Sequence, residues 1–473
     1  MANVNLKING KAVSVPAGTT VLEAAKAAGV TIPTLCAYEG MGPHAACRLC
    51  VVEVAGEAKE KLACAVKVSE GMDVTTDSPA LFELRKAAVT EMFRQHKVDC
   101  LHCVRVGSSK IEDLDPWFCE NCFYCDCVRD GFCELQALAR QFGVGKLPFE
   151  PQQNDFAPDC STDVILRDPN KCVKCRRCVD VCKNTQAVGV LGMVKTEAGQ
   201  TVGVTTAATL AESACIRCGR CVDVCPTGAV ALKEHKDELV YFAHQRDVQT
   251  AALVDASVLP ELEALYGGAI SLGQLAAALK KIGVDKVYDA EELRLIVADE
   301  AAQKLGKRRK KAPAIVAFDP AAKAWLEAFC SERKADFLLP DTAQTRFAAL
   351  TKGQFGKVFR ISGRNALAAE VQDTGCADFF YNARELFRIL KRTGADPTRR
   401  EDAALDTLGL EAPAPTGWAA VLAPIHWEVG GKSELVKLDV GGKEKTACIC
   451  RNPMQLKQAL ASGEACDLIR FGA

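Results

Sequence analysis

Two cysteine runs form the strongest pattern in this 473-residue chain: CVKCRRCVDVC at residues 172–182 and CIRCGRCVDVCP at residues 215–226. Each run has the spacing CxxCxxCxxxC, so together they supply eight thiols in two similar local arrangements. Twenty of the 25 cysteines lie at or before Cys225. In a reducing compartment, so many cysteines indicate thiolates held by metal rather than disulfides. We therefore expect a metal-rich N-terminal half and a metal-poor C-terminal half.

The overall composition limits the number of domains, the classes of partner and the cellular location that we expect. The length allows about two to four domains, and 49% apolar residues are enough for hydrophobic cores. Lys plus Arg number 59 and Asp plus Glu number 60, so the chain lacks the strong positive charge of nucleic-acid binders and polybasic membrane anchors. The N-terminus, MANVNLKINGKAVSV, has no signal-peptide pattern, and no apolar run reaches the roughly 18 residues of a membrane span. We expect a soluble, cytoplasmic protein without a nucleic-acid partner.

The two runs resemble those of bacterial two-cluster ferredoxins, in which the fourth cysteine of each run ligates the other cluster. The resemblance implies two [4Fe–4S] sites, the first held by Cys172, Cys175, Cys178 and Cys225 and the second by Cys182, Cys215, Cys218 and Cys221. Pro226 closes the second run as the family pattern expects, whereas Lys183 stands at the matching place in the first. This difference affects the turn and not the ligands. The basic residues between the thiols could offset cluster charge or receive an acidic ferredoxin, but most of them are expected to be solvated; they are Lys174, Arg176, Arg177, Arg217 and Arg220.

The first 78 residues carry another cysteine group in a strand-rich setting. VNLKI and KAVSV alternate as a hairpin would, and TTVLEAAKAAG has capping-box spacing between Thr20 and Glu23. The strand-like segments LCVVEV and KLACAVKV follow. This order resembles a β-grasp [2Fe–2S] ferredoxin, and four thiolates suit such a cluster because each iron takes two terminal ligands. The implied ligands are Cys36, Cys47, Cys50 and Cys64; a β-grasp domain that binds zinc or no metal is the alternative.

A helix is predicted next, because Ser78 and Pro79 suit the N-cap and N1 positions and apolar residues repeat at helical spacing at Leu81, Leu84, Ala88 and Met92. It leads to HKVDCLHC at residues 96–103. This HxxDCxxC motif, with the later GFCELQ, resembles the large iron–sulfur subunit of respiratory complex I and the electron-input domain of iron-only hydrogenases. The resemblance implies a [4Fe–4S] cluster held by His96, Cys100, Cys103 and Cys133. An imidazole in place of a thiolate should raise the potential of the cluster.

The stretch WFCENCFYCDCVRDGFCELQ at residues 117–136 departs from that family, whose second and third cysteines are only a few residues apart. CVRVGSS and CVRDGFC look like two copies of one phrase, and the first ends in Ser109 where the second has Cys133. The intervening insertion adds the four thiols of Cys119, Cys122, Cys125 and Cys127, which we interpret as the ligands of a further [4Fe–4S] cluster. A structural zinc ion and a redistribution of ligands around one cluster are the alternatives.

From about residue 240 the chain alternates helical and strand-like segments, which predicts an α/β domain. The phrases LGQLAAALKKIGVDKVYDAEE, FFYNARELFRILKRTGADP and QALASGEACDLIRFGA resemble the catalytic domain of iron-only hydrogenases. The places of two active-site cysteine stretches of that family read VAFDPAAKAW at 316–325 and RISGRNALAAE at 360–370. The resemblance therefore implies a domain that has lost its active-site cluster and performs no hydrogen chemistry. Cys448 and Cys450 are interpreted as structural.

The predicted fold class is multidomain, α+β and α/β. The expected domains are a β-grasp [2Fe–2S] ferredoxin domain at 1–78, a His-ligated [4Fe–4S] domain with its cysteine-rich insertion at 79–160, a two-[4Fe–4S] ferredoxin domain at 161–238, and a hydrogenase-like α/β domain lacking the active-site cluster at 239–473. The expected cofactors are one [2Fe–2S] cluster and three [4Fe–4S] clusters, with a fourth [4Fe–4S] cluster or zinc in the insertion.

The function predicted from these resemblances is electron relay within an NAD(H)-linked, flavin-based electron-bifurcating oxidoreductase complex of the transhydrogenase or hydrogenase type. No GxGxxG fingerprint occurs in a strand-turn-helix context, so NADH and FMN are expected on a separate flavoprotein subunit. A small [2Fe–2S] subunit, ferredoxin and a further catalytic subunit are the other expected partners. The alternatives are an electron-transfer subunit of a formate dehydrogenase or nickel-iron hydrogenase, and a non-redox scaffold or cluster-assembly factor.

Overall fold

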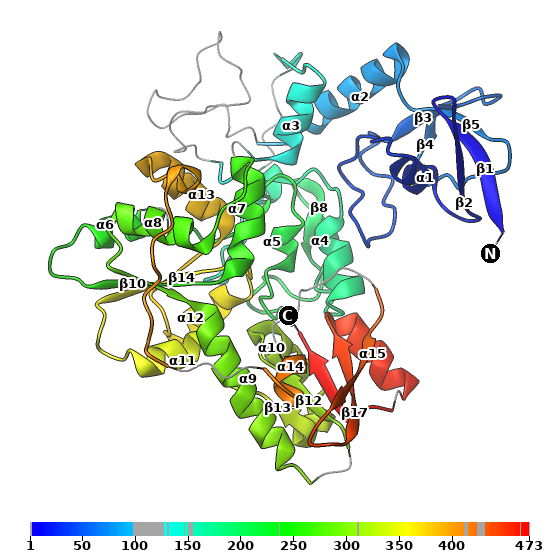
Figure 1. Ribbon diagram of the computed structural model, residues 1–473. Coiled ribbons are helices and arrows are strands. Elements are labelled where there is room, and N and C mark those ends of the chain that lie inside the picture. Colours follow the sequence, from blue (N-terminus) through cyan, green and yellow to red (C-terminus); the bar gives the residue numbers. More distant parts are fainter. Residues whose placement is uncertain are drawn as a thin grey trace.

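The computed structural model describes residues 2–97, 127–129, 132–145, 147–149, 155–235, 237–309, 312–410, 415–422, 431–463 and 465–472. The chain forms a mixed α/β, multidomain structure in which an N-terminal sheet, a helical connector, a cysteine-rich middle and a C-terminal α/β region follow one another (Figure 1). Among the described helices, none combines the length and apolar character needed to cross a membrane. Cys100, Cys103, Cys119, Cys122 and Cys125 lie outside the described residues.

The N-terminal part is a five-stranded sheet of order β2-β1-β5-β3-β4 with one helix against it. Its elements are β1 (Asn3–Ile8), β2 (Lys11–Pro16), α1 (Val21–Ala27), β3 (Val51–Val54), β4 (Lys61–Leu62) and β5 (Asp73–Thr75). The predicted hairpin and capping box are confirmed, since β1 pairs antiparallel with β2 and the Thr20 hydroxyl accepts from the Glu23 backbone N–H. The strand predicted over KLACAVKV is shorter than expected: β4 ends at Leu62, because the chain turns there to present Cys64.

Helix α2 (Pro79–Met92) begins where predicted, with Ser78 as its N-cap and Pro79 at N1. Its buried stripe differs from the expected one, because Leu81, Arg85 and Val89 are buried whereas Leu84 is 41% exposed. Arg85 is buried at a position where an apolar side chain would be expected. Its guanidinium donates hydrogen bonds to the backbone carbonyls of Leu49, Val51 and Thr76 at 2.8–3.0 Å. Apolar periodicity alone could not locate this face, because a long cation can be buried when backbone carbonyls accept from its donors.

The cysteine-rich middle consists of short elements around the two runs. They are α3 (Glu134–Gln141), β6 (Ile165–Arg167), α4 (Arg177–Asp180), β7 (Leu191–Thr196), β8 (Gly199–Val204), α5 (Arg220–Asp223) and β9 (Val230–Leu232). Strands β6 and β9 pair antiparallel, which brings the segment before the first run beside the segment after the second. The two runs thus begin and end at a common two-stranded sheet.

The C-terminal region contains two separate sheets, as expected for an α/β domain. The first has the order β11-β10-β14-β15 and is entirely parallel; its strands are β10 (Thr250–Val254), β11 (Lys286–Asp289), β14 (Lys357–Ile361) and β15 (Phe379–Tyr381). The second has the order β13-β12-β18-β17-β16, and only β16 is antiparallel to its neighbour; its strands are β12 (Ala314–Ala317), β13 (Phe337–Leu338), β16 (Glu434–Asp439), β17 (Glu444–Cys450) and β18 (Leu468–Phe471).

Helices surround both C-terminal sheets (Figure 1). They are α6 (Glu238–Ala243), α7 (Leu259–Tyr266), α8 (Leu272–Ile282), α9 (Ala290–Gly306), α10 (Pro320–Phe329), α11 (Ala343–Leu350), α12 (Leu367–Thr374), α13 (Ala383–Thr393), α14 (Trp418–Leu422) and α15 (Pro453–Ser462). Helix α8 begins with a capping box between Ser271 and Gln274 and ends at Gly283, whose φ of 115° suits glycine. Local sequence therefore sets both ends of this helix.

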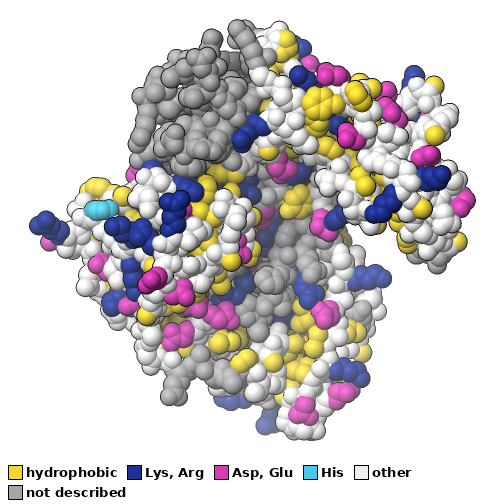
Figure 2. All heavy atoms as spheres, turned by 45° about the horizontal axis from the view of Figure 1, so that its top comes forward, with side chains coloured by type: hydrophobic (Ala, Val, Ile, Leu, Met, Phe, Trp, Pro, Cys, Tyr) yellow, Lys and Arg dark blue, Asp and Glu magenta, His cyan; other side chains and the backbone are white. Residues whose placement is uncertain are grey.

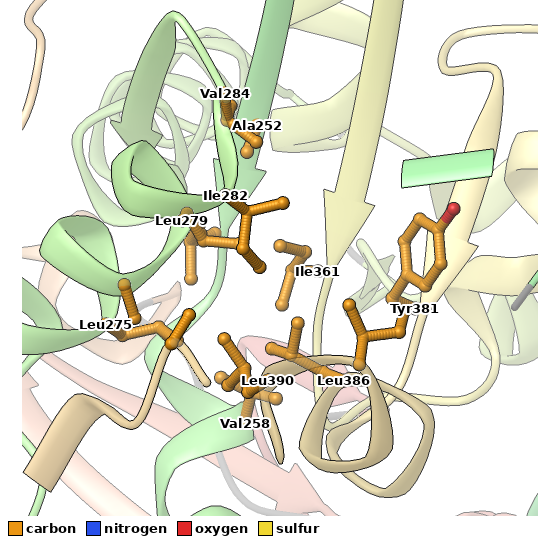
Figure 3. Close-up of a cluster of buried hydrophobic side chains, with 14 of the residues drawn as sticks. Ala252, Val258, Leu275, Leu279, Ile282, Val284, Ile361, Tyr381, Leu386 and Leu390 are labelled. Carbon is orange, nitrogen blue, oxygen red and sulfur yellow. The ribbon is translucent and has the colours of Figure 1, made fainter. Parts of the chain in front are cut away.

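The core of the first sheet is apolar. Figure 3 shows Leu275, Leu279 and Ile282 of α8 pointing toward Ile361 of β14 and toward Leu386 and Leu390 of α13, and all of these side chains are at most 3% exposed. On the molecular face in Figure 2, Lys and Arg side chains are interspersed with Asp and Glu, in keeping with the near-equal counts of the two charges. Burial of the α8 and α13 stripes holds this sheet together.

Candidate iron–sulfur centres

Each of the two predicted ferredoxin sites corresponds to a small cavity of about 20 Å³. The first cavity is lined by Cys172, Cys175, Cys178 and Cys225, and the second by Cys182, Cys215, Cys218 and Cys221. Both include one cysteine from the other run, so the structure gathers the thiols in the two exchanged sets that the sequence predicts. Burial raises the pKa of Cys175 and of Cys218 to about 12, so a thiolate here needs a positive partner such as cluster iron. Ligation itself remains a prediction.

Left-handed backbone conformations occur at matching positions in the two runs. Lys174 and Arg217 have φ values of 56° and 50°, and Arg176 and Gly219 have φ values of 66° and 72°. Non-glycine residues adopt this conformation at an energetic disadvantage, which surrounding structure must overcome. Here the conformation turns successive backbone N–H groups toward the thiols; the Lys174 N–H donates to Cys172 Sγ at 3.4 Å. Such a ring of N–H groups stabilises an anionic centre.

The four N-terminal thiols lie in two close pairs. Cys36 and Cys47 have their sulfurs 3.3 Å apart, and Cys50 forms the corresponding contact with Cys64. The contact with Cys47 lowers the pKa of Cys36 to about 5, and the contact with Cys50 lowers that of Cys64 to about 7. Two pairs of terminal thiols fit a two-iron cluster, because each of its irons takes two protein ligands. All four cysteines are buried, and Ala45 and Arg48 in the connecting loop have φ values of 49° and 56°.

The described part of the predicted His-ligated site contains His96 and Cys133, both buried. His96 Nδ1 lies 2.9 Å from the Lys171 carbonyl oxygen, which can only accept, so Nδ1 carries a proton and the neutral ring has its lone pair on Nε2. This is the tautomer that a metal-binding imidazole needs. Cys127, which we assigned to the insertion, belongs to the same buried cluster as Cys133 and contributes to raising its pKa to about 12, after the larger effect of burial.

One buried cluster connects the predicted centres. It contains Cys36 and Cys47 of the two-iron site, Cys133 of the His96 site and Cys175 of the first ferredoxin site, together with Cys127 of the insertion and Phe93. Arg177 bridges the same loops, because its guanidinium makes a bidentate ion pair with Glu134 at 2.7 and 2.8 Å and also donates to the Ala37 carbonyl. Arg177 is 3% exposed, so it is an exception to the expectation that most of the basic residues between the thiols are solvated.

The second run contacts the C-terminal region. Arg217 makes a bidentate ion pair with Asp373 of α12 at 2.6 and 2.8 Å, and Asn365 donates to Asp223 of α5. Ile216 and Val188 pack against the core of the second C-terminal sheet. The second ferredoxin site therefore lies directly against the C-terminal α/β region.

A polar cavity of about 50 Å³, which we call the arginine cavity, lies between the two C-terminal sheets. Both sequence stretches that we matched to hydrogenase ligand stretches reach it: VAFDPAAKAW contributes Phe318, Asp319 and Pro320, and RISGRNALAAE contributes Arg360, Arg364 and Leu367. The other described lining residues are Asp255, Arg294, Val297, Thr342, Ala343, Gln344, Leu422 and Arg470. No cysteine is among these described lining residues.

The five remaining cysteines of the C-terminal half lie apart from this cavity lining. Cys330, Cys448 and Cys450 are buried in one apolar cluster of the second sheet, and the sulfurs of Cys448 and Cys450 are 3.8 Å apart. Cys376 is buried between α12 and β15, and Cys466 is half-buried. Cys160, in the middle of the chain, is exposed.

The fold and its cysteine groups define an iron–sulfur protein with a hydrogenase-like C-terminal region. Three family descriptions match the chain: a 2Fe-2S iron-sulfur cluster binding domain at residues 1–79, a 4Fe-4S dicluster domain at residues 171–229, and the C-terminal domain of the iron only hydrogenase large subunit at residues 247–421. The chain is 30% identical to the NADP-reducing hydrogenase subunit HndD of Solidesulfovibrio fructosivorans, over 92% of this chain and 75% of that protein. It belongs to that iron-only hydrogenase subunit family.

Part of the chain is also similar to subunits of two other oxidoreductases. It is 32% identical to the NADPH-Fe(3+) oxidoreductase subunit alpha of Geobacter sulfurreducens (strain DL-1 / KN400), over 38% of this chain and 18% of that protein. Identity is 29% with the mitochondrial 78 kDa subunit of NADH-ubiquinone oxidoreductase of Neurospora crassa, over 40% of this chain and 23% of that protein. The chain thus spans about a fifth of each of these two relatives.

Solved structures with a partial likeness cover half of the chain. A chain of NAD+-reducing [NiFe]-hydrogenase in the H2-reduced state matches with a TM-score of 0.42 and 28% identity, over 50% of this chain and 89% of that one. An [FeFe]-hydrogenase HydA structure matches with a TM-score of 0.41 and 14% identity, over 50% of this chain and 81% of that one.

Proposed function

We propose that this chain is the electron-relay subunit of an NAD(P)-linked, flavin-based electron-bifurcating oxidoreductase complex. The observation that carries the proposal is the buried cluster that holds cysteines of three successive centres, namely Cys36 and Cys47, then Cys133, then Cys175. In this proposal the cluster provides a path along which single electrons pass from the N-terminal two-iron site, through the His96 site, to the first ferredoxin site. The relatives named as NADP-reducing hydrogenase and NADPH-Fe(3+) oxidoreductase subunits support the link to a nicotinamide.

The path continues toward the C-terminal region. A second buried cluster contains Cys178 and Cys225 of the first ferredoxin site, and Cys182, Cys215 and Cys221 of the second pack against it. The same cluster includes Leu367 and Val371 of α12. We infer that ligands are grouped as the sequence predicts, within the domains proposed at 1–78, 79–160, 161–238 and 239–473. The N-terminal sites face a flavoprotein subunit that carries FMN and NADH, and ferredoxin or another catalytic subunit takes electrons from the ferredoxin pair.

We propose further that the hydrogenase-like region is a scaffold and docking surface without an active-site cluster. The stretches matched to hydrogenase ligands converge on the arginine cavity, where the described lining presents guanidinium and carboxylate groups. Guanidinium groups cannot replace thiolates as iron ligands, because they are protonated at all physiological pH values. The purified chain is therefore expected to show no hydrogen evolution or uptake after treatment with maturation factors. Hydrogen turnover, measured by gas chromatography, is the result that would contradict this role.

The relay role is tested on the native complex. NADH added to the complex should reduce the iron–sulfur clusters of this chain, followed by electron paramagnetic resonance, whereas NADH added to the isolated chain should reduce none. Copurification of a molybdenum or nickel subunit would favour the formate dehydrogenase or nickel-iron hydrogenase alternative. Clusters that stay oxidised in the complex when NADH reduces the flavin would refute electron relay and favour a scaffold or assembly factor.

The three interpretations of the cysteine-rich insertion predict different metal contents for the chain. If Cys119, Cys122, Cys125 and Cys127 hold a [4Fe–4S] cluster, the fully loaded chain contains about 18 irons and no zinc. A structural zinc predicts about 14 irons with one zinc, and redistribution of ligands around one cluster predicts about 14 irons alone. The position of Cys127 beside Cys133 supports that last alternative over zinc. Plasma mass spectrometry of the anaerobically purified chain distinguishes the three outcomes.

A further inference from the structure

The arginine cavity lies at the carboxyl ends of the central parallel strands of both C-terminal sheets. Asp255 follows β10, Asp319 follows β12, and Arg470 lies near the end of β18. In each sheet the chain places successive strands on opposite sides of these central strands, with β11 and β14 flanking β10, and β13 and β18 flanking β12. Open α/β sheets bind ligands at such positions, because the connecting loops diverge there and leave a crevice.

The charge of the described cavity lining is unbalanced. It contains four arginines and two aspartates, which leaves a formal surplus of two positive charges; the arginines are Arg294, Arg360, Arg364 and Arg470. Asp255 faces three of them: its carboxylate lies 3.1 Å from Arg360 and 3.1 Å from Arg294. Arg364 is 4.0 Å from the same carboxylate. The three guanidinium groups therefore share this one buried carboxylate, although Arg294 also pairs with Glu291, outside the lining, at 3.2 Å. The remaining excess of cations favours the binding of a further anion.

Arg470 is the lining cation that pairs with no carboxylate of the described residues. Its side chain is 2% exposed and makes one hydrogen bond with the described residues, from Nη1 to the Phe471 carbonyl oxygen at 2.7 Å. The guanidinium lies 4.8 Å from the centre of the Phe318 ring, and its Nε–H is buried with no acceptor in the described part of the chain. A guanidinium has five N–H donors, so most of its hydrogen-bonding capacity is unused. Burial, reinforced by the charge of Arg364, lowers the pKa of Arg470 to about 9.

Two helix N-termini add to the positive potential. Asp319 and Pro320 begin α10, a helix of 10 residues, and Thr342, Ala343 and Gln344 begin α11, a helix of 8 residues. The N-terminal end of a helix carries a partial positive charge and favours anions. Glu370, which accepts a hydrogen bond from Thr342, has its pKa raised to about 7 by burial, so it offsets the cavity charge only in part.

The cavity also presents unsatisfied acceptors. Asp319 Oδ1 accepts from the Ala322 N–H at 3.0 Å as the cap of α10, but Oδ2 is buried and receives no donor from the described residues. The same holds for Gln344 Oε1 among those residues. An anion that only accepts would be repelled by these oxygens, whereas one that retains a proton could donate to them. At neutral pH hydrogen phosphate has both properties, and sulfate lacks the proton.

We propose that the arginine cavity binds a protonated tetrahedral oxyanion, the free hydrogen phosphate ion. In this complex Arg470 and Arg364 donate to the phosphate oxygens, and the phosphate hydroxyl donates to Asp319 Oδ2. The site lies in the C-terminal region that packs against the second ferredoxin cluster, and its ligand is chemically unrelated to iron and thiolate.

The test is isothermal titration calorimetry of the holo chain under anaerobic conditions with sodium phosphate, sodium sulfate and glycerol phosphate at matched ionic strength. We expect one phosphate per chain, with sulfate at least about tenfold weaker and Arg470→Met weakening phosphate by at least about tenfold. Arg399→Gln, which removes a guanidinium that is 85% exposed, is the matched charge control and should leave binding unchanged. Glycerol phosphate, a monoester dianion that has lost this proton at neutral pH, should also bind at least about tenfold more weakly than phosphate, and its equal binding would contradict the role of the proton.

Asp319→Asn is the second variant, because asparagine retains the helix cap but can donate where Asp319 only accepts. This variant should reduce the preference for phosphate over sulfate at least about tenfold. It therefore tests phosphate binding in the cavity even if Arg470→Met fails to fold. Absence of saturable phosphate binding at millimolar concentration would overturn the proposal. Equal binding of sulfate, or unchanged phosphate binding in a folded Arg470→Met chain, would overturn it as well.

Discussion

Replacing Cys225 with alanine is expected to remove one [4Fe–4S] cluster, or about four irons per chain, from the first ferredoxin site and not from the second. Cys225 closes the second run in sequence, but its thiol lines the cavity of Cys172, Cys175 and Cys178. Without it one corner of that cluster has no protein ligand, and the buried thiols of Cys175 and Cys178 lose the charge compensation that the cluster iron would provide. Iron content and electron paramagnetic resonance of the reduced chain measure the loss.

The matched variants for this test are Cys182→Ala and Cys160→Ala. Cys182 lines the other cavity, so its replacement should remove the second cluster and leave the first. Cys160 is exposed and should be replaceable without loss of iron. If Cys225→Ala instead abolished the signal that Cys218→Ala abolishes, each run would hold its own cluster and the exchanged grouping would be wrong.

Replacing Asp255 with asparagine is expected to destabilise the C-terminal region by about 3–5 kcal/mol, the usual effect of removing one partner of a buried ion pair. Asp255 is 1% exposed and is the carboxylate shared by Arg360, Arg294 and Arg364. Asparagine has nearly the same shape as aspartate, so the loss of stability reflects the missing charge rather than altered packing. Urea denaturation followed by hydrogen exchange in peptides covering β10 and β14 reports the change locally.

The same carboxylate predicts an acid dependence of stability. Burial alone would raise the pKa of Asp255, but Arg360, Arg294 and Arg364 outweigh burial and hold this pKa below its ordinary value. The unfolded chain binds this proton near pH 4, so the contribution of Asp255 is fully present above that pH and is lost as the pH falls toward the folded-state pKa. Asp255→Asn should therefore flatten the acid limb of the stability curve of this region.

Asp406→Asn is the control for both effects. Asp406 also contacts two cations, Lys286 at 2.9 Å and Lys280 at 3.2 Å, but its side chain is 18% exposed and the Lys286 side chain is 52% exposed. Solvent screens such a pair, and we expect a change of at most about 1 kcal/mol. Equal destabilisation by the two substitutions would show that burial does not set the strength of the Asp255 cluster.

Short sequence patterns correctly predicted the structural features that are formed by residues close together in the chain. The Thr20 capping box, the Ser78 N-cap with Pro79, and the alternation of VNLKI and KAVSV appear in the structure because caps and hairpins are satisfied within a few residues. Two expectations about secondary structure were wrong, each for a physical reason. KLACAVKV forms only a two-residue strand, and the buried face of α2 includes Arg85 in place of Leu84, since backbone carbonyls distant in sequence satisfy that guanidinium.

The sequence by itself determined the chemistry of this protein: the CxxCxxCxxxC spacing, the HxxDCxxC motif and the paired N-terminal cysteines specify thiol-rich centres because cluster ligands are supplied by short segments. Only the tertiary structure decided how these segments meet. It buries Arg177 between three cysteine loops, places Cys127 beside Cys133, and brings Arg360, Arg364 and Arg470 from different strands and loops to one cavity. The reason is that burial and charge compensation depend on residues that can be far apart in the sequence, such as Arg177 and Ala37, which are 140 positions apart, and no local pattern records such contacts.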